Sequence, residues 1–415
     1  MIFMNLELFL AHRLYNTRNG ERHISRPAVT IAQWGVTIGT IVMFLSICII
    51  VGFKNQVRDK AVGFGGHIQV LNYERSSEST IPITADSILT TELLATDGVK
   101  HIQQYAQIPG IILANSEYEG IMLKGVDSDY DMSFFASNIV EGELPQFTSE
   151  SASNAIVISK TTANRLKLKS GDRVNIYFMQ GGTRARKMTV SAIYETHLTE
   201  FDNVMALTDI YTTRKLNGWE KEEATGIEIT ADEYDNRYIC SERIESIIDD
   251  AAIRNHEGLY SATIDELYPG IFNWLGVLDQ TVWIILILVI CIAGFTMISG
   301  LFILILEKSN FIGIMKAVGA RNLSIRKTFI YYAGMIVVKG MLIGNAIAIA
   351  MCVIQQLTGI IAIDPEMYYM DKVPIEFSWL LAPMNIAMFL ISIAILVVPS
   401  MLISRIDPVK AIKFE

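Results

Sequence analysis

Apolar residues gather in four long runs, one near the start of the chain and three in its last third. These runs are residues 28–52, 277–306, 329–358 and 377–403. About 20 mostly apolar residues cross a bilayer as a helix, so each run is long enough. The second run carries no charge between Val282 and Leu306, which disfavours the alternative of core helices in a soluble protein. The pattern predicts four transmembrane helices.

A mostly polar stretch separates the first two runs, and its hydrophobic periodicity changes from segment to segment. Short β-branched segments bounded by turn residues predict strands, and segments with apolar residues on one face predict helices. The predicted strands are residues 155–159, 174–178, 188–194, 204–207 and 226–230, and the predicted helices are residues 160–167, 208–216 and 232–250. We therefore expect an α-helical membrane domain of four transmembrane helices plus an α+β extracytoplasmic domain, residues 53–276, inserted between helices 1 and 2.

The segment before the first run, residues 1–27, is polar or mixed. Leu6, Phe9, Leu10 and Leu14 recur at helical spacing, which predicts a short interfacial helix, although a frayed leader would fit as well. No small-residue cleavage site follows the first run, so we interpret that run as an uncleaved anchor.

Basic residues predict the orientation of the spans, because cytoplasmic links are enriched in Lys and Arg. The link 307–328 holds five basic residues against one acid, whereas the link 359–376 holds four acids against Lys372. Residues 1–27 and the tail 404–415 are also basic. We expect these two ends and the link 307–328 in the cytoplasm, and residues 53–276 and 359–376 in the periplasm.

Composition changes this picture little. Hydrophobic residues make up 51% of the 415 positions and the mean hydropathy is +0.36, too apolar for an ordinary soluble enzyme. Residues 53–276 carry 20 basic and 33 acidic side chains, and an acidic outer domain argues against nucleic-acid binding. Only Cys240 of the four cysteines lies in this domain, so no disulfide can form within it.

The sequence shows no catalytic, metal or cofactor site. HExxH and GxSxG patterns are absent, and the four cysteines have no metal-ligand spacing. Asp127, Asp129 and Asp131 alternate as in a calcium loop but lack its glycine and distal glutamate. Residues 313–319 begin and end with glycine, but Ala320 and Arg321 follow where a Walker A loop needs Lys and Ser or Thr. We predict no enzyme activity, no cofactor and no ATP binding in this chain.

Several segments together resemble the permease subunits of the lipoprotein-releasing system, the LolC/LolE family, within the FtsX/MacB-like class of ABC transporters. ELFLAHR from Glu7 is similar to the family's ELFIAxRY, and GHIQV from Gly66 to its PHI.V. AGFTMISGL from Ala293, EK from Glu307 and IGIMKAVGA from Ile312 together resemble AAFNIISxL…EKxxxIAILKALGA. The end of the chain, IDPVKAIKFE from Ile406, resembles I.P.KALRYE. The resemblance covers nearly the whole chain.

The resemblance implies a non-catalytic inner-membrane permease that extracts lipoproteins from the outer leaflet and passes them towards the outer membrane. It implies a second permease, as homodimer or heterodimer, two copies of a separate ABC ATPase that binds ATP and Mg²⁺, and a periplasmic lipoprotein carrier. The link 307–328 would be the coupling helix, and its short, basic and apolar character suits contact with a partner. The expected coupling residues are Glu307, Lys308, Phe311, Ile312, Gly313, Ile314, Met315, Lys316 and Gly319.

The first two spans flank the outer domain, so they are the expected walls of a cavity for acyl chains. The candidate wall residues are Met43, Phe44, Ile47, Val51, Val282, Ile285 and Val289, although any spanning helix shows such residues to lipid. The GxxxG pairs Gly35/Gly39 and Gly340/Gly344 allow close helix packing. Lys339 is a charge inside the third span and needs a polar partner or access to headgroups.

Two alternative functions share these features. One is a MacB-like mechanotransmission permease that expels peptides or toxins, and the other is an FtsX-like transmitter that activates a cell-wall hydrolase. A long Pro-rich hook marks the carrier-binding permease of the LolC/LolE family between two strands of the outer domain. Residues 179–187 are short there and lack proline, so we expect carrier binding elsewhere.

Overall fold

The structure is a computed structural model that describes residues 6–16, 25–74, 81–179, 182–401 and 403. The chain divides into two compact units. The helical domain comprises Met1–Lys54, Leu275–Ala362 and Lys372–Glu415, and the sheet domain comprises Asn55–Trp274 and Ile363–Asp371. The end of the chain that resembles the family, from Ile406 onward, lies outside the described residues.

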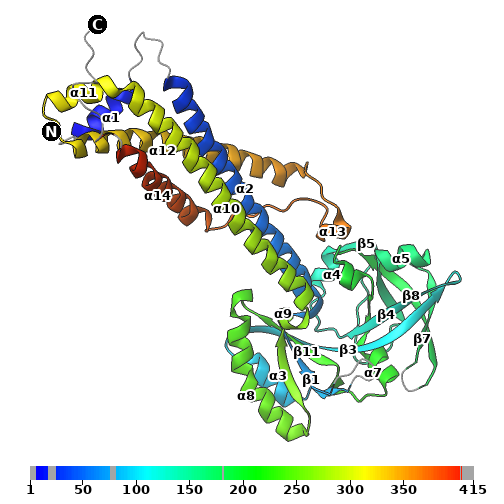
Figure 1. The fold of residues 1–415 in the computed structure, drawn as a ribbon. Coiled ribbons are helices and arrows are strands. Elements are labelled where there is room, and N and C mark those ends of the chain that lie inside the picture. Colours follow the sequence, from blue (N-terminus) through cyan, green and yellow to red (C-terminus); the bar gives the residue numbers. More distant parts are fainter. Residues whose placement is uncertain (1–5, 17–24, 75–80, 180–181, 402, 404–415) are drawn as a thin grey trace. The chain divides into compact units, whose positions relative to one another are not determined.

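Four helices of the described chain are long and apolar enough to cross a membrane, one for each predicted span. They are α2 (Ser25–Gly65), α10 (Pro269–Glu307), α12 (Asn322–Thr358) and α14 (Leu381–Ser400) (Figure 1). Helix α2 continues 13 residues beyond the predicted end of its span. Val57, Ala61 and Phe64 are buried at helical spacing in this extension, so packing replaces the hydrophobic run as the reason for the helix.

Shorter helices complete the helical domain. The predicted helix near the start of the chain is confirmed as α1 (Leu6–Asn16), which packs along α12. The Tyr15 ring meets the Tyr332 ring edge-on at 6.0 Å, and the Ser324 hydroxyl donates to Glu7 Oε1 at 3.0 Å. Helix α11 (Ser309–Ala317) forms most of the ordered link between α10 and α12.

The link between α12 and α14 is a hairpin rather than a plain loop. Ala362 and Lys372 form a β-bridge, and the Ile363 amide donates to the Asp371 carbonyl at 3.0 Å. At the tip, α13 (Pro365–Tyr368) is followed by Tyr369, whose carbonyl accepts from Lys60 Nζ at 2.6 Å. Residues Ile363–Asp371 therefore belong to the sheet domain, although they lie far from it in sequence.

One half of the sheet domain is a four-stranded antiparallel sheet with helices on one face. The strand order is β12 (Leu259–Thr263), β1 (Ile68–Asn72), β11 (Gly226–Ala231) and β3 (Val99–Ala114). Helices α3 (Ser87–Leu94) and α8 (Arg237–Asn255) supply Leu89, Leu93, Ile244 and Ile248 to its buried core. The small elements of this half are β2 (Ile83–Thr84), β10 (Glu223–Ala224), η1 (Tyr234–Asn236) and α9 (Ile264–Leu267).

The other half is a closed circuit of six strands. Strand β3 pairs with β4 (Glu117–Val126), and the circuit continues through β9 (Met205–Asp209), β6 (Ala155–Ser159), β8 (Arg184–Tyr194) and β7 (Arg173–Phe178) back to β3. A second buried apolar cluster fills it. The edge strand β5 (Ile139–Gly142) pairs with β8, and the helices are α4 (Ser133–Ser137), α5 (Lys160–Leu166), α6 (Thr199–Asp202) and α7 (Ile210–Asn217).

The α+β character of this domain is confirmed. All five predicted strands exist as β6, β7, β8, β9 and β11, and α5 and α7 follow the predicted helices closely. Asp209 caps α7 by accepting from the Thr212 amide at 2.7 Å. The third predicted helix, residues 232–250, is displaced along the chain, because α8 begins at Arg237 and ends at Asn255.

Candidate functional site

The link helix α11 and Val318, the residue that follows it, expose two apolar side chains. Ile314 is 49% exposed and Val318 is 82% exposed, four residues apart on one face. Ile312 is fully buried in the helical domain's own apolar core, and Gly313 is buried beside it. Gly319, just after the helix, has a backbone φ of +93°, which favours glycine. The structure therefore offers Ile314 and Val318, not Ile312, as contacts for another protein.

Two of the other predicted coupling residues, Met315 and Lys316, hold α11 to the helical domain. Lys316 Nζ donates to the Ile403 carbonyl at 2.9 Å, and Met315 packs against the apolar core. Lys308 and Glu307 lie within ion-pair distance of each other, at 3.6 Å, while Phe311 is half-buried.

Helix α2 packs along α10 as an antiparallel seam. A Cβ at Gly35 would lie 2.5 Å from the Thr296 hydroxyl oxygen, and a Cβ at Gly39 would lie 3.3 Å from a Val289 methyl. At the other end of the seam, Lys54 Nζ lies 2.7 Å from Asp279 Oδ2. Gly35 and Gly39 thus let α10 approach closely, and the ion pair closes the seam.

The predicted cavity walls lie mostly inside this packing. Met43 and Ile47 are buried in the apolar core with Leu286, and Val51 and Val282 pack against the same cluster. The Phe44 side chain lies in a different apolar cluster, and its ring meets the Phe377 ring edge-on at 6.3 Å. Ile285 is 36% exposed. The structure brings most of these side chains together, but as a closed seam.

Helix α12 packs on α2 through small residues at four-residue steps. A Cβ at Gly340 would lie 3.0 Å from the Gln33 carbonyl oxygen, and a Cβ at Gly344 would lie 2.8 Å from the Thr37 carbonyl oxygen. The step continues to Ala348 and Cys352, which share a buried cluster with Phe44 and Cys48. Sequence analysis identified the two glycines but not this continuation.

Lys339, next to Gly340 in α12, is exposed. Its Nζ is 5.7 Å from the centre of the Tyr15 ring, within the range of a cation–π contact. The aromatic partner comes from α1.

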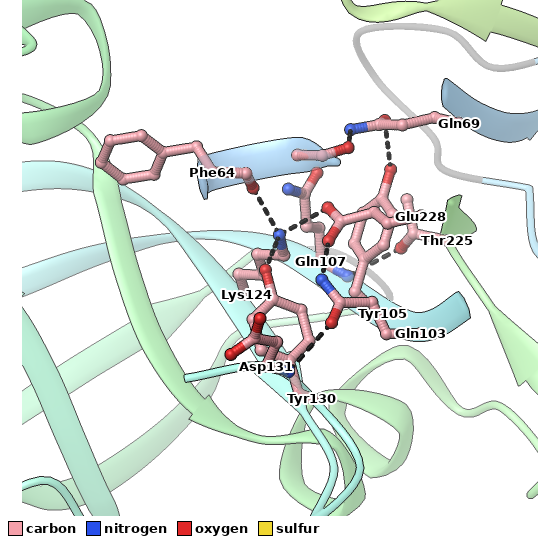
Figure 2. A network of polar contacts seen from close by, with 11 residues as sticks. Phe64, Gln69, Gln103, Tyr105, Gln107, Lys124, Tyr130, Asp131, Thr225 and Glu228 are labelled. Atoms are coloured by element: carbon pink, nitrogen blue, oxygen red, sulfur yellow. Dashed lines mark hydrogen bonds and ion pairs between the residues drawn. The ribbon is translucent and has the colours of Figure 1, made fainter. Parts of the chain in front are cut away.

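A buried polar site lies in the sheet domain, where α2 ends (Figure 2). Lys124 of β4 is 1% exposed, and its Nζ donates to Glu228 Oε1 at 2.5 Å, to the Phe64 carbonyl at 2.7 Å and to the Tyr130 hydroxyl at 2.8 Å. Burial lowers the pKa of the Lys124 ammonium, and the Glu228 carboxylate opposes that shift. No sequence pattern marks this site, because its charged partners are 104 residues apart.

His67, three residues after Phe64, is a half-buried titratable group of the same domain. Burial lowers the pKa of His67 to about 4, and the charges of Arg58 and Arg237 add to the effect. Its Nδ1 accepts from the Ala231 amide at 3.1 Å, which requires an unprotonated nitrogen.

Among the described residues, no three His, Cys, Asp or Glu side chains gather as metal ligands. The acidic loop after β4 is used locally instead. Asp131 Oδ1 accepts from the Ser133 amide at 2.9 Å, and Asp127 Oδ1 accepts from the Ser128 amide at 2.6 Å. These carboxylates therefore stabilise their own turn.

Two models of known protein families match this chain. A family model described as the MacB-like periplasmic core domain matches residues 30–247, more than half of the chain. A second, described as the FtsX-like permease C-terminal, matches residues 283–408.

Two curated relatives match this chain over most of their length. The lipoprotein-releasing system transmembrane protein LolE of Haemophilus influenzae is 21% identical over 91% of both chains. The LolC protein of Neisseria meningitidis serogroup B is 22% identical over 92% of both chains. The solved periplasmic region of MacB from Actinobacillus actinomycetemcomitans is 11% identical and covers 51% of this chain and 95% of its own, with a TM-score of 0.36. The chain belongs to the MacB-like periplasmic core domain family and, with its FtsX-like C-terminal part, to the FtsX/MacB-like class of ABC transporter permeases that includes LolC and LolE.

Proposed function

We propose that this chain is the permease subunit of an ATP-driven complex that extracts lipoproteins from the outer leaflet of the inner membrane. The observation that carries the proposal is the match to LolE and LolC over about nine tenths of each chain, in which membrane helices and sheet domain align together. In this proposal the chain hydrolyses no ATP, and extracted lipoproteins move on towards the outer membrane.

The charge distribution supports a defined orientation. The link that contains α11 holds Lys308, Lys316, Arg321, Arg326 and Lys327, and such basic links stay in the cytoplasm. Both ends of the chain are then cytoplasmic, and the sheet domain is periplasmic.

Helix α11 supports docking of a separate ATPase. Its exposed pair, Ile314 and Val318, gives an apolar contact of the kind that fills a groove on a partner, and the basic residues around it favour an acidic rim. The chain has no Walker A sequence, so ATP and Mg²⁺ bind to the partner. Two ATPase copies and a second permease complete the complex.

The seam between α2 and α10 supports a closed resting state. Val51 and Val282 pack against the apolar core near the Lys54–Asp279 ion pair, which lies at the same end of both helices. We propose that acyl chains reach Met43, Ile47, Val51, Val282, Ile285 and Val289 only when this seam opens. The short β7–β8 hairpin leaves carrier binding to the second permease or to another surface.

Depletion tests the proposal directly. Cells that lose this chain should retain outer-membrane lipoproteins in the inner membrane, measured by separating the two membranes and blotting for acylated proteins. Restoring the wild-type chain should reverse the change. Unchanged partitioning would reject lipoprotein release, and the MacB-like match would then favour efflux of peptides or toxins, tested by their accumulation. An FtsX-like transmitter would instead alter cell-wall hydrolysis.

A further inference from the structure

Helix α2 runs without a break from Ser25 to Gly65, through its apolar span and into the sheet domain. The last carbonyls of a helix have no partner within the helix. Here two of them are bound by side chains of the sheet: the Phe64 carbonyl accepts from Lys124 Nζ at 2.7 Å, and the Gly65 carbonyl accepts from Gln69 Nε2 at 2.9 Å. The end of the helix is therefore held by hydrogen bonds of fixed direction.

The ammonium that binds Phe64 is itself fixed by three strands. Glu228 of β11 accepts from Lys124 Nζ, and its other oxygen accepts from Gln103 of β3 at 2.9 Å. The Tyr105 hydroxyl, also on β3, donates to Gln69 Oε1 at 2.9 Å (Figure 2). The Tyr105 and Tyr130 rings each lie 4.9 Å from the Lys124 nitrogen. The Phe64 and Gly65 carbonyls are thus both bound by side chains of one hydrogen-bonded network.

Aromatic packing holds the same turn of α2. The Phe64 ring stacks on Phe201 at 4.4 Å with an angle of 11° between the rings, and it meets the Phe134 and Phe135 rings edge-on. Gly63 leaves room for this, because a Cβ there would lie 2.3 Å from the Phe134 ring. Polar and apolar contacts therefore fix both the backbone and the side chain of one helical turn.

A buried Lys–Glu pair is a costly way to stabilise a domain, because well-packed apolar residues often serve equally well. What a charged network adds is direction: each hydrogen bond requires its donor and acceptor in one geometry. A cation at the end of a helix also complements the negative end of the helix dipole.

We propose that Lys124 is a positioning residue that fixes the last turns of α2, from Asn55 to Gly65, to the sheet and so sets the direction of the helix there. This inference rests on the proposed function in one respect: it assumes that the partner ATPase moves the membrane helices.

Distance measurements on the assembled complex test it without any substrate. Spin labels replace Gln56 of α2 and Glu117 of β4, both exposed, in a chain whose four cysteines are changed to serine. Pulsed electron–electron resonance should give one narrow distance that is the same without nucleotide and with ATP trapped on a hydrolysis-deficient ATPase. A distance that changes with nucleotide would overturn the proposal.

The matched variant is Lys124→Met with Glu228→Leu, which removes both charges. It should at least double the width of the distance distribution and lower lipoprotein release per ATP hydrolysed several-fold. The control removes an exposed ion pair of the same domain, Arg243→Gln with Asp97→Asn, and should match wild type.

A double variant with a wild-type distribution and wild-type coupling would show that the network has no positioning role. If the double variant fails to fold, the wild-type complex still tests the proposal, because a distance that changes with nucleotide would overturn it. If the wild-type complex releases no lipoprotein while the distances behave as expected, the proposed function fails and this inference stands.

Discussion

The Thr37 hydroxyl of α2 donates a hydrogen bond to the main-chain oxygen of Gly340 in α12, over 3.1 Å. Such a contact between two helices requires backbones that approach closely, and it occurs here because residues 340 and 344 have no side chain. The seam between α2 and α12 is thus built on two glycines.

We predict that Gly344→Leu destabilises the helical domain by about 1–3 kcal/mol, because its side chain would overlap the Thr37 carbonyl and the Thr40 side chain. Thermal unfolding of the purified chain in detergent measures the effect. Gly334→Leu is the matched control, since the nearest atom to its Cβ would be an Ile393 methyl at 3.4 Å. Equal melting temperatures for the two variants would contradict the proposed seam.

Charge at the exposed face of α11 should uncouple the ATPase. We expect Ile314→Asp with Val318→Asp to reduce co-purification of the ATPase at least tenfold, because a carboxylate would be buried in an apolar contact. The control is Leu323→Asp, which changes a side chain of the same link that is 63% exposed. If both variants retained the ATPase, docking would have to use another surface.

Covalent linkage across the α2–α10 seam should stop transport. We expect Lys54→Cys with Asp279→Cys, joined by a short bis-maleimide, to lose lipoprotein release in proteoliposomes while ATP hydrolysis continues. Cys291 is exposed and is changed to serine in this background. Lys54→Cys alone, treated with the same reagent, is the control. Normal release from the linked protein would show that the seam stays closed during transport.

Acid should weaken the sheet domain through His67. Its pKa in the folded chain is about 4, against 6.5 in the unfolded chain, so the unfolded state binds the extra proton between these values. The free energy of unfolding should therefore fall as the pH drops from about 6.5 to about 4. Denaturant unfolding at several pH values measures this, and His67→Gln should flatten the profile over that range. An unchanged profile would assign the acid sensitivity to other groups.

Lys60 should hold the tip of the α12–α14 hairpin. Its Nζ donates to the Thr196 and Tyr369 carbonyls, both at 2.6 Å. We expect Lys60→Met to raise amide hydrogen exchange in residues 363–371 at least tenfold, measured by mass spectrometry of the full-length protein. Lys215→Met, which changes an exposed lysine, is the control. Equal exchange in both variants would show that the Trp274–Tyr369 ring contact suffices.

Local sequence signals predicted part of the fold well. The run from β6 through α5 to β8 carries its strand residues, its caps and its turn within forty residues, so its elements follow from neighbouring positions. Strands β3 and β4 were missed, although they form the longest hairpin. Pro109 lies within β3 and usually argues against a strand, and the turn at Asn115 and Ser116, both with positive φ, lacks glycine.

The candidate site likewise has parts that local sequence patterns predict and parts that they do not. The basic link and the GxxxG pairs are local patterns, so their positions were predicted from the sequence, whereas the orientation of Ile312 and Ile314 depends on what α11 packs against. Lys124 and Glu228 give no local signal at all. A lysine in a strand is ordinary until the fold brings a carboxylate and a helix end to the same point.

Strand β3 belongs to both halves of the sheet domain, since it pairs with β11 on one side and with β4 and β7 along its length. Sliding or spreading the two halves would break main-chain hydrogen bonds that no side-chain rearrangement can replace. Separating the two halves would therefore cost hydrogen bonds of the strand that they share. We therefore expect the two halves of the sheet domain to keep a fixed geometry relative to one another.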